Sequence, residues 1–357
     1  MNEQRYTRQT TLKDFGEEGQ QKLTEAKVLV VGAGGLGVPV MTYLNGMGVG
    51  TIGIVDDDVV SLTNLHRQVL YTEANVGKAK VASAIKTLQL QNSATELIGH
   101  ETFLSVENAL SIIQAYDIIV DATDNFPTRY LINDASVILR KPFVYGALHG
   151  YEGQVSVFNH NEGSTYRCLF PDMPKEDEVP NCNEHGVLGI IPGIVGNLQA
   201  LETVKLITGV GDVLSGELLL YNGLSQTLQK IRFKPLPANR KITKLLASYE
   251  FSCRTALQSI DSDAFEKLLA NENIQIVDVR TETEYSVIHL KNSVNIPLAD
   301  LETRIDELPL NAPIYFICQS GIRSRKAILT LQNAKLKEDL INVSGGMNNL
   351  KNHVAEY

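Results

Sequence analysis

The stretch Lys27-Val-Leu-Val-Val-Gly-Ala-Gly-Gly-Leu-Gly37 decides the fold of the first part of this chain. Its first five residues read as a buried strand, and Gly32, Gly34 and Gly37 fit the spacing G-x-G-x-x-G. Glycines at this spacing allow a tight turn that brings backbone N–H groups and a helix N-terminus against phosphate. We therefore predict a strand, a glycine turn and a helix that runs to about Met47.

A second strand follows at Thr51–Val55 and ends at Asp56. Strand, turn, helix and strand form a βαβ unit, in which the Asp56 carboxylate can accept hydrogen bonds from ribose hydroxyls. These features fit NAD, FAD and ATP equally well. They predict a Rossmann-like α/β domain that binds a nucleotide, and they leave the nucleotide open.

Composition narrows the class of protein. The 357 residues are 43% hydrophobic and 20% charged, the profile of a globular protein with about two domains. The net charge of −9 argues against a general nucleic-acid binder, which needs a basic face. We see no signal peptide, and the longest apolar stretch, Gly186–Gly196, is too short to span a membrane. Four cysteines without a CxxC pair suit a reducing cytoplasm.

The amino-acid composition changes near Lys234, where prolines and mixed charge interrupt the alternation of predicted strands and helices. We expect a first domain at 1–236, a linker at 237–256 and a second, smaller α/β domain at 257–357. Other strands of the first domain are expected at 117–121, 143–145, 154–158, 218–221 and 227–233, with a long helix at about 187–208. In the second domain, strands are expected at 274–279 and 314–317 and a helix at 324–334.

Three charged residues favour ATP over a dinucleotide. A triphosphate attacked at its α-phosphorus develops more negative charge than a bound pyrophosphate, and it needs cationic side chains and a metal. Arg67 and Lys80 supply the cations, and Asp124 supplies a hard oxygen ligand for magnesium. We therefore expect ATP and magnesium.

Residues 1 to about 235 resemble the MoeB/ThiF/HesA family, the prokaryotic relatives of ubiquitin-activating enzymes. The segments that carry the resemblance are Arg5-Tyr-Thr-Arg-Gln9, the Gly32–Gly37 turn, Asp56-Asp-Asp58, Thr63-Asn-Leu-His-Arg-Gln68, Val76-Gly-Lys-Ala-Lys80, Asp121-Ala-Thr-Asp-Asn125, Gly153-Gln-Val155 and Gly186-Val-Leu-Gly189. The resemblance implies a Rossmann-like ATP-binding domain with a mixed sheet. It also implies adenylation of the C-terminal glycine of a ubiquitin-like sulfur-carrier protein, similar to MoaD or ThiS.

The same resemblance implies roles for matching residues. It implies nucleotide contact for Gly35, ribose binding for Asp56, phosphate contacts for Asn64, Arg67 and Lys80, magnesium binding for Asp124, and a place beside it for Asn125. Arg8 would reach the ATP phosphates from a partner subunit, so the resemblance also implies a homodimer.

A second reactive site is predicted where the strand at 314–317 runs into Cys318-Gln-Ser-Gly-Ile-Arg-Ser324. Loop N–H groups that point at the sulfur, with the positive charge of Arg323, favour thiolate and persulfide forms. We expect Asp278, Arg280 and His289 to be structural.

Residues 258 to 352 resemble a rhodanese domain. The active loop of that family is six residues long from cysteine to arginine. The loop here has the same length and consists of Cys318, Gln319, Ser320, Gly321, Ile322 and Arg323. The resemblance implies that Cys318 carries sulfur as a persulfide, which a cysteine desulfurase or thiosulfate would supply.

Two further cysteines have different surroundings. Cys182 lies in a segment rich in proline and charge, and relatives with a rhodanese partner use a cysteine at this position for sulfur relay. We expect a covalent role for Cys182, with an incidental thiol as the alternative.

Many family members hold zinc with two CxxC pairs, of which only Cys168 remains here, so four tetrahedral ligands cannot be assembled. We expect no zinc site and a small buried Cys168.

The expected function is therefore that of an adenylyltransferase with a sulfurtransferase domain, which makes a thiocarboxylate for molybdopterin, thiamine or tRNA thiolation. Two alternatives stay open. One is an NAD- or FAD-linked oxidoreductase, and the other is a scaffold in which only the rhodanese domain is active.

Overall fold

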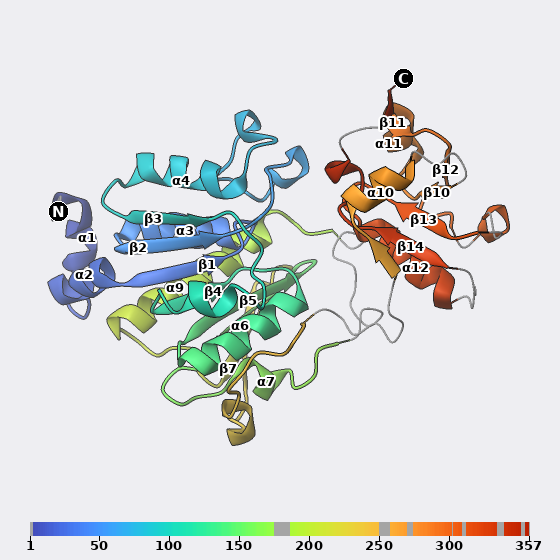
Figure 1. The fold of residues 1–357 in the computed structure, drawn as a ribbon. Helices are drawn as coiled ribbons and strands as arrows, with labels where there is room; N and C mark the ends of the chain where they lie inside the picture. The colour runs from blue at the N-terminus through green and yellow to red at the C-terminus, as the bar shows by residue number, and fades with distance from the viewer. Residues whose placement is uncertain are drawn as a thin grey trace. The chain divides into compact units, whose positions relative to one another are not determined.

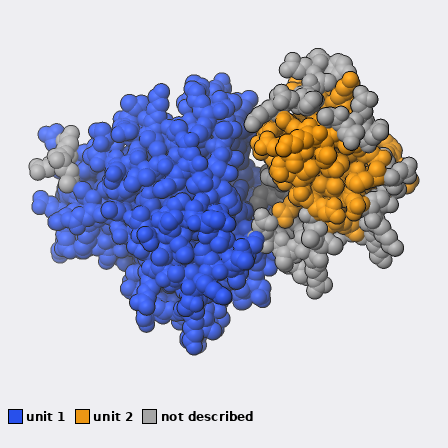
Figure 2. Space-filling model, in the orientation of Figure 1, with its two compact units in different colours: residues 1–251 blue, residues 252–357 orange. Residues whose placement is uncertain are grey.

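The computed structural model describes residues 3–174, 186–249, 258–269, 274–301, 303–308, 312–333, 339–350 and 354–356. Contacts divide the chain into two compact units, Met1–Phe251 and Ser252–Tyr357, which have different colours in Figure 2. Each unit has its own sheet and its own core.

Unit 1 is built on an eight-stranded sheet with the order β3-β2-β1-β4-β5-β6-β7-β8 (Figure 1). Neighbours from β3 to β5 are parallel, and those from β5 to β8 are antiparallel, so the sheet is mixed as predicted. The strands are β1 (Lys27–Val31), β2 (Thr51–Val55), β3 (Glu96–His100), β4 (Ile118–Asp121), β5 (Phe143–His149), β6 (Glu152–Phe158), β7 (Glu217–Asn222) and β8 (Thr227–Arg232).

Helices cover both faces of this sheet. The helices are α1 (Glu3–Thr10), α2 (Gly16–Glu25), α3 (Gly37–Met47), α4 (Lys80–Gln91), α5 (Ala109–Ile113), α6 (Phe126–Leu139), α7 (Tyr166–Leu169) and α9 (Ile190–Thr208). One core packs α2, α3, α4 and α9 against the sheet. A second core packs α5, α6 and α7 against the opposite face. Alternate strand residues such as Val30 and Leu29 enter these two cores, as the period of a strand requires.

The glycine turn between β1 and α3 depends on backbone geometry that other residues resist. Gly32 has a φ of 101°, and a Cβ on Gly37 would overlap the carbonyl oxygen of Gly32. The register of the sheet places Val31 beside Val55 and Asp121. The residues that follow these three strands therefore meet at one carboxyl edge, where α/β sheets bind ligands.

The helix α9 is the long apolar helix that the sequence predicts, three residues shorter at its start. Its length and composition would allow it to cross a membrane, but half of the apolar window is buried inside the structure. The side chain of Gln199, which is fully buried, donates a hydrogen bond to the carbonyl oxygen of Asp121 at 2.7 Å. These contacts make α9 a core helix.

The segment expected as a linker, 237–256, begins as part of unit 1. Residues 237–240 form a 3-10 turn, and Leu245 and Tyr249 join the core around α6. The side chain of Tyr249 is 4% exposed. Pro235 and Pro237 make the start of this stretch look like a loop in the sequence, but its later apolar residues bury surface and so attach it to the domain.

Unit 2 holds a five-stranded parallel sheet with the order β12-β10-β13-β14-β9. Its strands are β9 (Gln258–Ile260), β10 (Gln275–Asp278), β12 (Ser293–Asn295), β13 (Ile314–Ile317) and β14 (Leu340–Val343), and β11 (Ile288–Leu290) pairs with β15 (Val354–Glu356). Its helices are α10 (Ser262–Leu269), α11 (Glu282–Val287) and α12 (Ile322–Asn333). This second α/β unit confirms the predicted fold class.

Candidate active sites

A cavity of 690 Å³ is lined by the glycine turn of unit 1, a volume within the range of about 300–1,000 Å³ for ligand sites. Its lining includes every residue for which the sequence implied nucleotide binding in the same chain: Gly35, Asp56, Asn64, Arg67, Lys80, Asp124 and Asn125. Arg67, Lys80 and Asp124, which favour ATP over a dinucleotide, therefore face one space.

Asp56 follows β2 and is tied to the glycine turn. Its carboxylate accepts hydrogen bonds from the N–H of Ala33 at 2.7 Å and from the N–H of Asp58 at 2.9 Å. Burial raises the pKa of Asp56, against the opposing effects of Lys80 and these two N–H groups. The carboxylate thus lies beside the glycine turn, and ribose binding by Asp56 stays a prediction.

Lys80 begins α4 and is only 5% exposed. Its Nζ lies 2.8 Å from Oδ2 of Asp58, a carboxylate on the exposed rim. A buried cation needs such a partner when no phosphate is present, because an unpaired buried charge is costly. The pair shows how the lysine is held ready at the cavity.

Arg67 and Asn64 come from the segment after β2. Arg67 Nη1 donates to the carbonyl oxygen of Thr63 at 3.1 Å and lies 2.7 Å from Nε2 of His66. The Asn64 side chain accepts from the N–H of Ser61 at 3.3 Å within a capping box. These local bonds orient both side chains in the lining.

Asp124 and Asn125 stand at the start of α6 and have different roles. The Asn125 side-chain oxygen accepts from the N–H of Thr128 at 2.9 Å, so it caps the helix. The exposed Asp124 carboxylate forms no hydrogen bond or ion pair with another residue that the structure describes. Its oxygens are the hard ligands that magnesium prefers.

Arg129 and Gln68 are among the lining residues to which no role was assigned from the sequence. Arg129, buried in the first turn of α6, donates to the carbonyl oxygen of Thr123 at 2.9 Å and so holds the turn that carries Asp124. The signal was present: Asn125 followed by Pro127 marks a helix start, which puts Arg129 one turn in. Gln68 ends the segment Thr63–Gln68, which carries the family resemblance. It is buried, and its Oε1 has no partner among the described residues.

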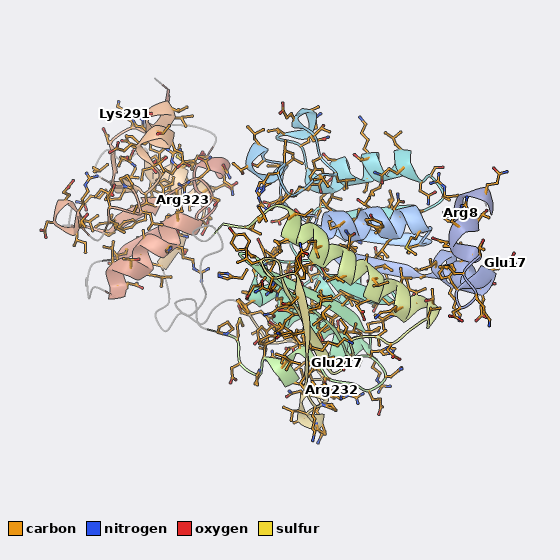
Figure 3. The ribbon with its side chains drawn as sticks, turned by 180° about the vertical axis from the view of Figure 1, so that it is seen from behind. Arg8, Glu17, Glu217, Arg232, Lys291 and Arg323 are labelled. Atoms are coloured by element: carbon orange, nitrogen blue, oxygen red, sulfur yellow. The ribbon has the colours of Figure 1, made fainter. Side chains whose placement is uncertain are left out.

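Arg8 does not line the cavity of its own chain. It is exposed on α1, where Figure 3 labels it. The helix is anchored by Tyr6, whose hydroxyl accepts from Nδ2 of Asn92 at 2.9 Å. A contact of Arg8 with ATP in a second subunit stays a prediction.

Cys168 is not the small buried residue that we expected. It is partly exposed, and its sulfur accepts hydrogen bonds from the N–H of Thr165 at 3.3 Å and of Leu236 at 3.2 Å, and from Asn239 at 3.7 Å. Burial raises the pKa of Cys168, but these bonds outweigh it and the net shift is downward. Two segments far apart in the sequence, 165–168 and 236–239, thus meet around one thiol.

No group of three or more histidine, cysteine, aspartate or glutamate side chains in the described ranges could hold a metal ion. The absence of zinc from this protein stays a prediction. Cys182, the expected relay cysteine, lies outside the residues that the structure describes, as does Cys253.

Cys318 directly follows β13 in unit 2 and is fully buried. Its sulfur accepts from the N–H of Gly321 at 3.1 Å and lies 3.5 Å from the Ser324 hydroxyl. Gly321 has a φ of 89°, and a Cβ on Gly346 would overlap the Cys318 carbonyl oxygen. The loop from Cys318 to Arg323 is therefore shaped by backbone that needs glycine, with one N–H aimed at the sulfur as predicted.

Arg323 has a partner that the sequence did not predict. Its guanidinium forms two bonds to the Glu284 carboxylate, at 2.6 and 2.7 Å, and it also interacts electrostatically with Cys318, as expected. This contact with Arg323 lowers the pKa of Glu284 to about 2.

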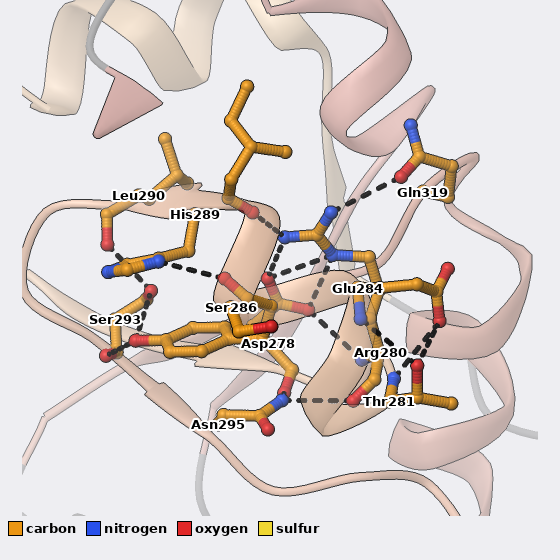
Figure 4. A network of polar contacts seen from close by, with 12 residues as sticks. Asp278, Arg280, Thr281, Glu284, Ser286, His289, Leu290, Ser293, Asn295 and Gln319 are labelled. Atoms are coloured by element: carbon orange, nitrogen blue, oxygen red, sulfur yellow. Dashed lines mark hydrogen bonds and ion pairs between the residues drawn. The ribbon is translucent and has the colours of Figure 1, made fainter. Parts of the chain in front are cut away.

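A buried ion pair supports the active loop (Figure 4). Arg280 Nη2 lies 2.7 Å from Oδ2 of Asp278, and Arg280 Nη1 donates to Oε1 of Gln319 at 3.2 Å. His289 Nδ1 lies 2.9 Å from the Tyr285 carbonyl oxygen, and the two rings stack at 4.1 Å. The geometry gives all three of Asp278, Arg280 and His289 structural contacts, as expected.

Comparison with known families and curated proteins matches both units. The ThiF family matches residues 6–241, and the rhodanese-like domain matches residues 261–353. "Adenylyltransferase and sulfurtransferase MOCS3" of Aedes aegypti is 43% identical, over 91% of this chain and 80% of its own length. "Probable adenylyltransferase/sulfurtransferase MoeZ" of Mycobacterium tuberculosis is 38% identical, over 96% of this chain and 91% of its own length.

Solved structures share the fold of unit 1. The complex of E. coli MccB with MccA-N7isoASN superposes with a TM-score of 0.60 at 21% identity, and covers 68% of this chain and 75% of MccB. MccB with ATP gives a TM-score of 0.59 at 22% identity, over 66% and 73%. At these identities, the likeness shows the fold alone.

Proposed function

Because this chain belongs to the ThiF family and carries a C-terminal rhodanese-like domain, we propose that it adenylates the C-terminal carboxylate of a ubiquitin-like sulfur-carrier protein and then replaces AMP by sulfur. It is an adenylyltransferase and sulfurtransferase like its curated relatives. The observation that carries the proposal is the convergence of Arg67, Lys80 and Asp124 on the cavity of the glycine turn.

In the first step, an oxygen of the carrier carboxylate attacks the α-phosphorus of ATP, and pyrophosphate leaves. The carboxylate is already a nucleophile, so positioning and charge neutralisation determine the rate. Lys80 exchanges Asp58 for phosphate oxygens, Arg67 neutralises charge beside it, and Asp56 holds the ribose. An NAD- or FAD-linked oxidoreductase would have no use for these cations, and neither alternative function matches the relatives' names.

Magnesium fits the cavity as the partner of ATP. The Asp124 carboxylate offers unengaged oxygens to it, and Arg129 fixes the turn that carries Asp124 through the Thr123 carbonyl. When bound, the ion neutralises phosphate charge. Arg129 holds the turn that carries Asp124, and Asn125 caps the N-terminus of α6.

In the second step, the outer sulfur of a Cys318 persulfide attacks the acyl carbon of the adenylate, and AMP leaves. The product is an acyl disulfide between Cys318 and the carrier. A thiolate then attacks the Cys318 sulfur, which releases the carrier thiocarboxylate and leaves a disulfide that a cellular thiol reduces. We propose Cys182 for this thiolate, with thiosulfate or a cysteine desulfurase as the source of the sulfane sulfur.

Two further features complete the proposal. The exposed position of Arg8 supports a homodimer in which each Arg8 serves the partner's ATP. The four cysteines without a CxxC pair support a cytoplasmic location. The product would serve molybdopterin, thiamine or tRNA thiolation.

The test is intact-mass spectrometry of candidate carriers incubated with the full chain, ATP, magnesium, thiosulfate and a thiol. A carrier that gains sulfur in place of oxygen identifies function and partner together. Cys318→Ala should abolish this product with thiosulfate and leave it with sulfide, which attacks the adenylate directly. Sulfur transfer to cyanide without any ATP-dependent change in a carrier would instead support the scaffold.

A further inference from the structure

A buried amide of the cavity lining has no hydrogen-bond partner. Gln68 lines the nucleotide cavity and is only 3% exposed. Its Oε1 is unpartnered, and its Nε2 forms no hydrogen bond with another residue that the structure describes. The Oε1 of Gln199 is unpartnered too, but Gln199 lies outside the lining and its Nε2 is bonded. Leaving a buried polar group unsatisfied is destabilising, so at a ligand cavity it indicates that the ligand supplies the missing bond.

Two turns fix the backbone that carries this amide. The N–H of Gln68 donates to the Asn64 carbonyl oxygen at 3.0 Å, and the Gln68 carbonyl oxygen accepts from the N–H of Tyr71 at 3.1 Å. The buried hydroxyl of Tyr71 donates to the Ala33 carbonyl oxygen in the glycine turn at 2.9 Å. The segment that carries Gln68 is therefore tied directly to the turn.

Successive residues of the glycine turn face different groups. The residue before Gly34 donates its N–H to Asp56, for which we propose ribose binding. A Cβ on Gly34 would lie 3.7 Å from Nε2 of Gln68. A Cβ on Gly35 would lie 3.5 Å from Cγ of Arg67. The order along the turn is thus carboxylate, amide and guanidinium. In ATP the α-phosphate follows the ribose and precedes the outer phosphates, so this order matches the amide to the α-phosphate.

We propose that Gln68 is a catalytic residue of adenylation, whose Nε2 donates a hydrogen bond to a non-bridging oxygen of the α-phosphate. The inference rests on the proposed function. In that step a carrier carboxylate oxygen bonds to the α-phosphorus, the bond from this phosphorus to the pyrophosphate oxygen breaks, and pyrophosphate leaves. Gln68 transfers no proton. Its donor stabilises the negative charge that develops on the α-phosphate, and the fixed backbone holds it in place beforehand.

The unpartnered amide predicts opposite effects on stability and rate in the full chain. Methionine is unbranched and apolar, and replacing an unsatisfied buried amide by an apolar group of similar shape is neutral or stabilising. The urea midpoint of Gln68→Met should therefore equal or exceed that of the wild type. The kcat of carrier-dependent ATP–pyrophosphate exchange should fall about 10²- to 10³-fold, the effect of losing one preorganised donor. The Kd of ATP, measured by calorimetric titration, should change far less, because the donor acts on charge that develops in the transition state.

A second variant separates the donor from the shape of the side chain. Gln68→Glu keeps the length and an oxygen but has no N–H, and it should lose as much rate as Gln68→Met. Gln21→Met is the matched control, because it makes the same change on the exposed side of α2, where the amide donates to Glu25 at 2.9 Å. It should leave kcat, Kd and the urea midpoint unchanged.

Three results would overturn the role of Gln68. One is an unchanged kcat in either variant at position 68, and another is an ATP Kd that rises as much as kcat falls. The third is a lower urea midpoint in Gln68→Met, which would show that the free amide already has a stabilising partner. A wild type without carrier-dependent exchange refutes the proposed function instead.

Discussion

At the scale of single residues, the buried lysine of the cavity is held in an ion pair. Lys80 is buried and bound to Asp58, which is exposed and can move away when phosphate arrives. Exchange of one anion for another avoids leaving the lysine unpaired in the low dielectric of the site. Under the proposed function, the contribution of Lys80 to ATP affinity would therefore be a difference between two ion pairs.

Lys80→Ala should lower carrier-dependent ATP–pyrophosphate exchange by about 10²- to 10³-fold, the effect of removing one preorganised charge stabiliser. Lys78→Ala is the matched control, since Lys78 lies two residues earlier and is exposed, and its side chain donates only to the Ala74 carbonyl oxygen among the residues that the structure describes. It should stay within about twofold of the wild type in the same assay. Equal losses in both variants would contradict the assigned role of Lys80.

The Glu284–Arg323 pair predicts a pH dependence of stability in unit 2. The folded pKa of Glu284, about 2, lies below its ordinary value of 4.5. The stabilisation is thus present above about pH 4.5 and is lost as the pH falls toward 2. Relative to Glu284→Gln, which keeps the capping box with Thr281, the wild type should be more stable at pH 6, and the difference should shrink by pH 3.

Hydrogen exchange of peptides from α12, the helix that carries Arg323, measures this difference in the full chain. Glu307→Gln serves for comparison, because it removes an exposed pair with Arg304, and such pairs contribute little. A difference for Glu284→Gln that does not vary with pH would show that packing, and not charge, is responsible.

At the scale of elements, α3 contains two glycines with opposite surroundings. Gly37 begins the helix where a Cβ would overlap the backbone of Gly32, whereas Gly46 is exposed with nothing within 4 Å of an added Cβ. The first glycine is required by the turn that receives phosphate. The second only carries the entropic disadvantage of glycine in a helix.

Gly37→Ala should destabilise unit 1 by about 1–3 kcal/mol through overpacking, and it should weaken ATP binding because the turn must shift. Gly46→Ala should be neutral or stabilising by up to about 1 kcal/mol, with unchanged ATP binding. Urea unfolding and calorimetric titration with ATP measure both quantities. Comparable ATP affinities for the two variants would argue against phosphate binding at this turn.

At the scale of elements, the ends of strands could be predicted from the sequence, and contacts between elements could not. The strand ends at Val31, Val55 and Asp121 could be predicted because their runs of apolar residues stop at glycine or aspartate. Arg129 was missed although Asn125 and Pro127 mark the helix start that places it. The partnership of Arg323 with Glu284 could not be predicted, since it depends on side chains that separate elements bring together. The attachment of Tyr249 was missed for the same reason, because its partner Asp134 lies 115 positions earlier.

At the scale of the whole molecule, the exposed Arg8 on α1 predicts shared active sites between two copies of the chain. Arg8→Ala and Lys80→Ala should each be inactive in ATP–pyrophosphate exchange. Mixing them by unfolding and refolding should restore activity, since a mixed dimer has one site with both defects and one with neither. A mixture that remains as inactive as its components would refute transfer of Arg8 between subunits.

The burial of Tyr249 also determines where this protein can be cut. Residues 237–249 read as dispensable, but removing them would uncover the Asp134 carboxylate and the Arg167 guanidinium and strip two apolar side chains from the core around α6. A first half that ends at residue 236 would therefore tend to aggregate on its own. A fragment that keeps Tyr249 retains its natural edge, and so would a chimaera that borrows a rhodanese unit from a relative and joins it beyond that residue.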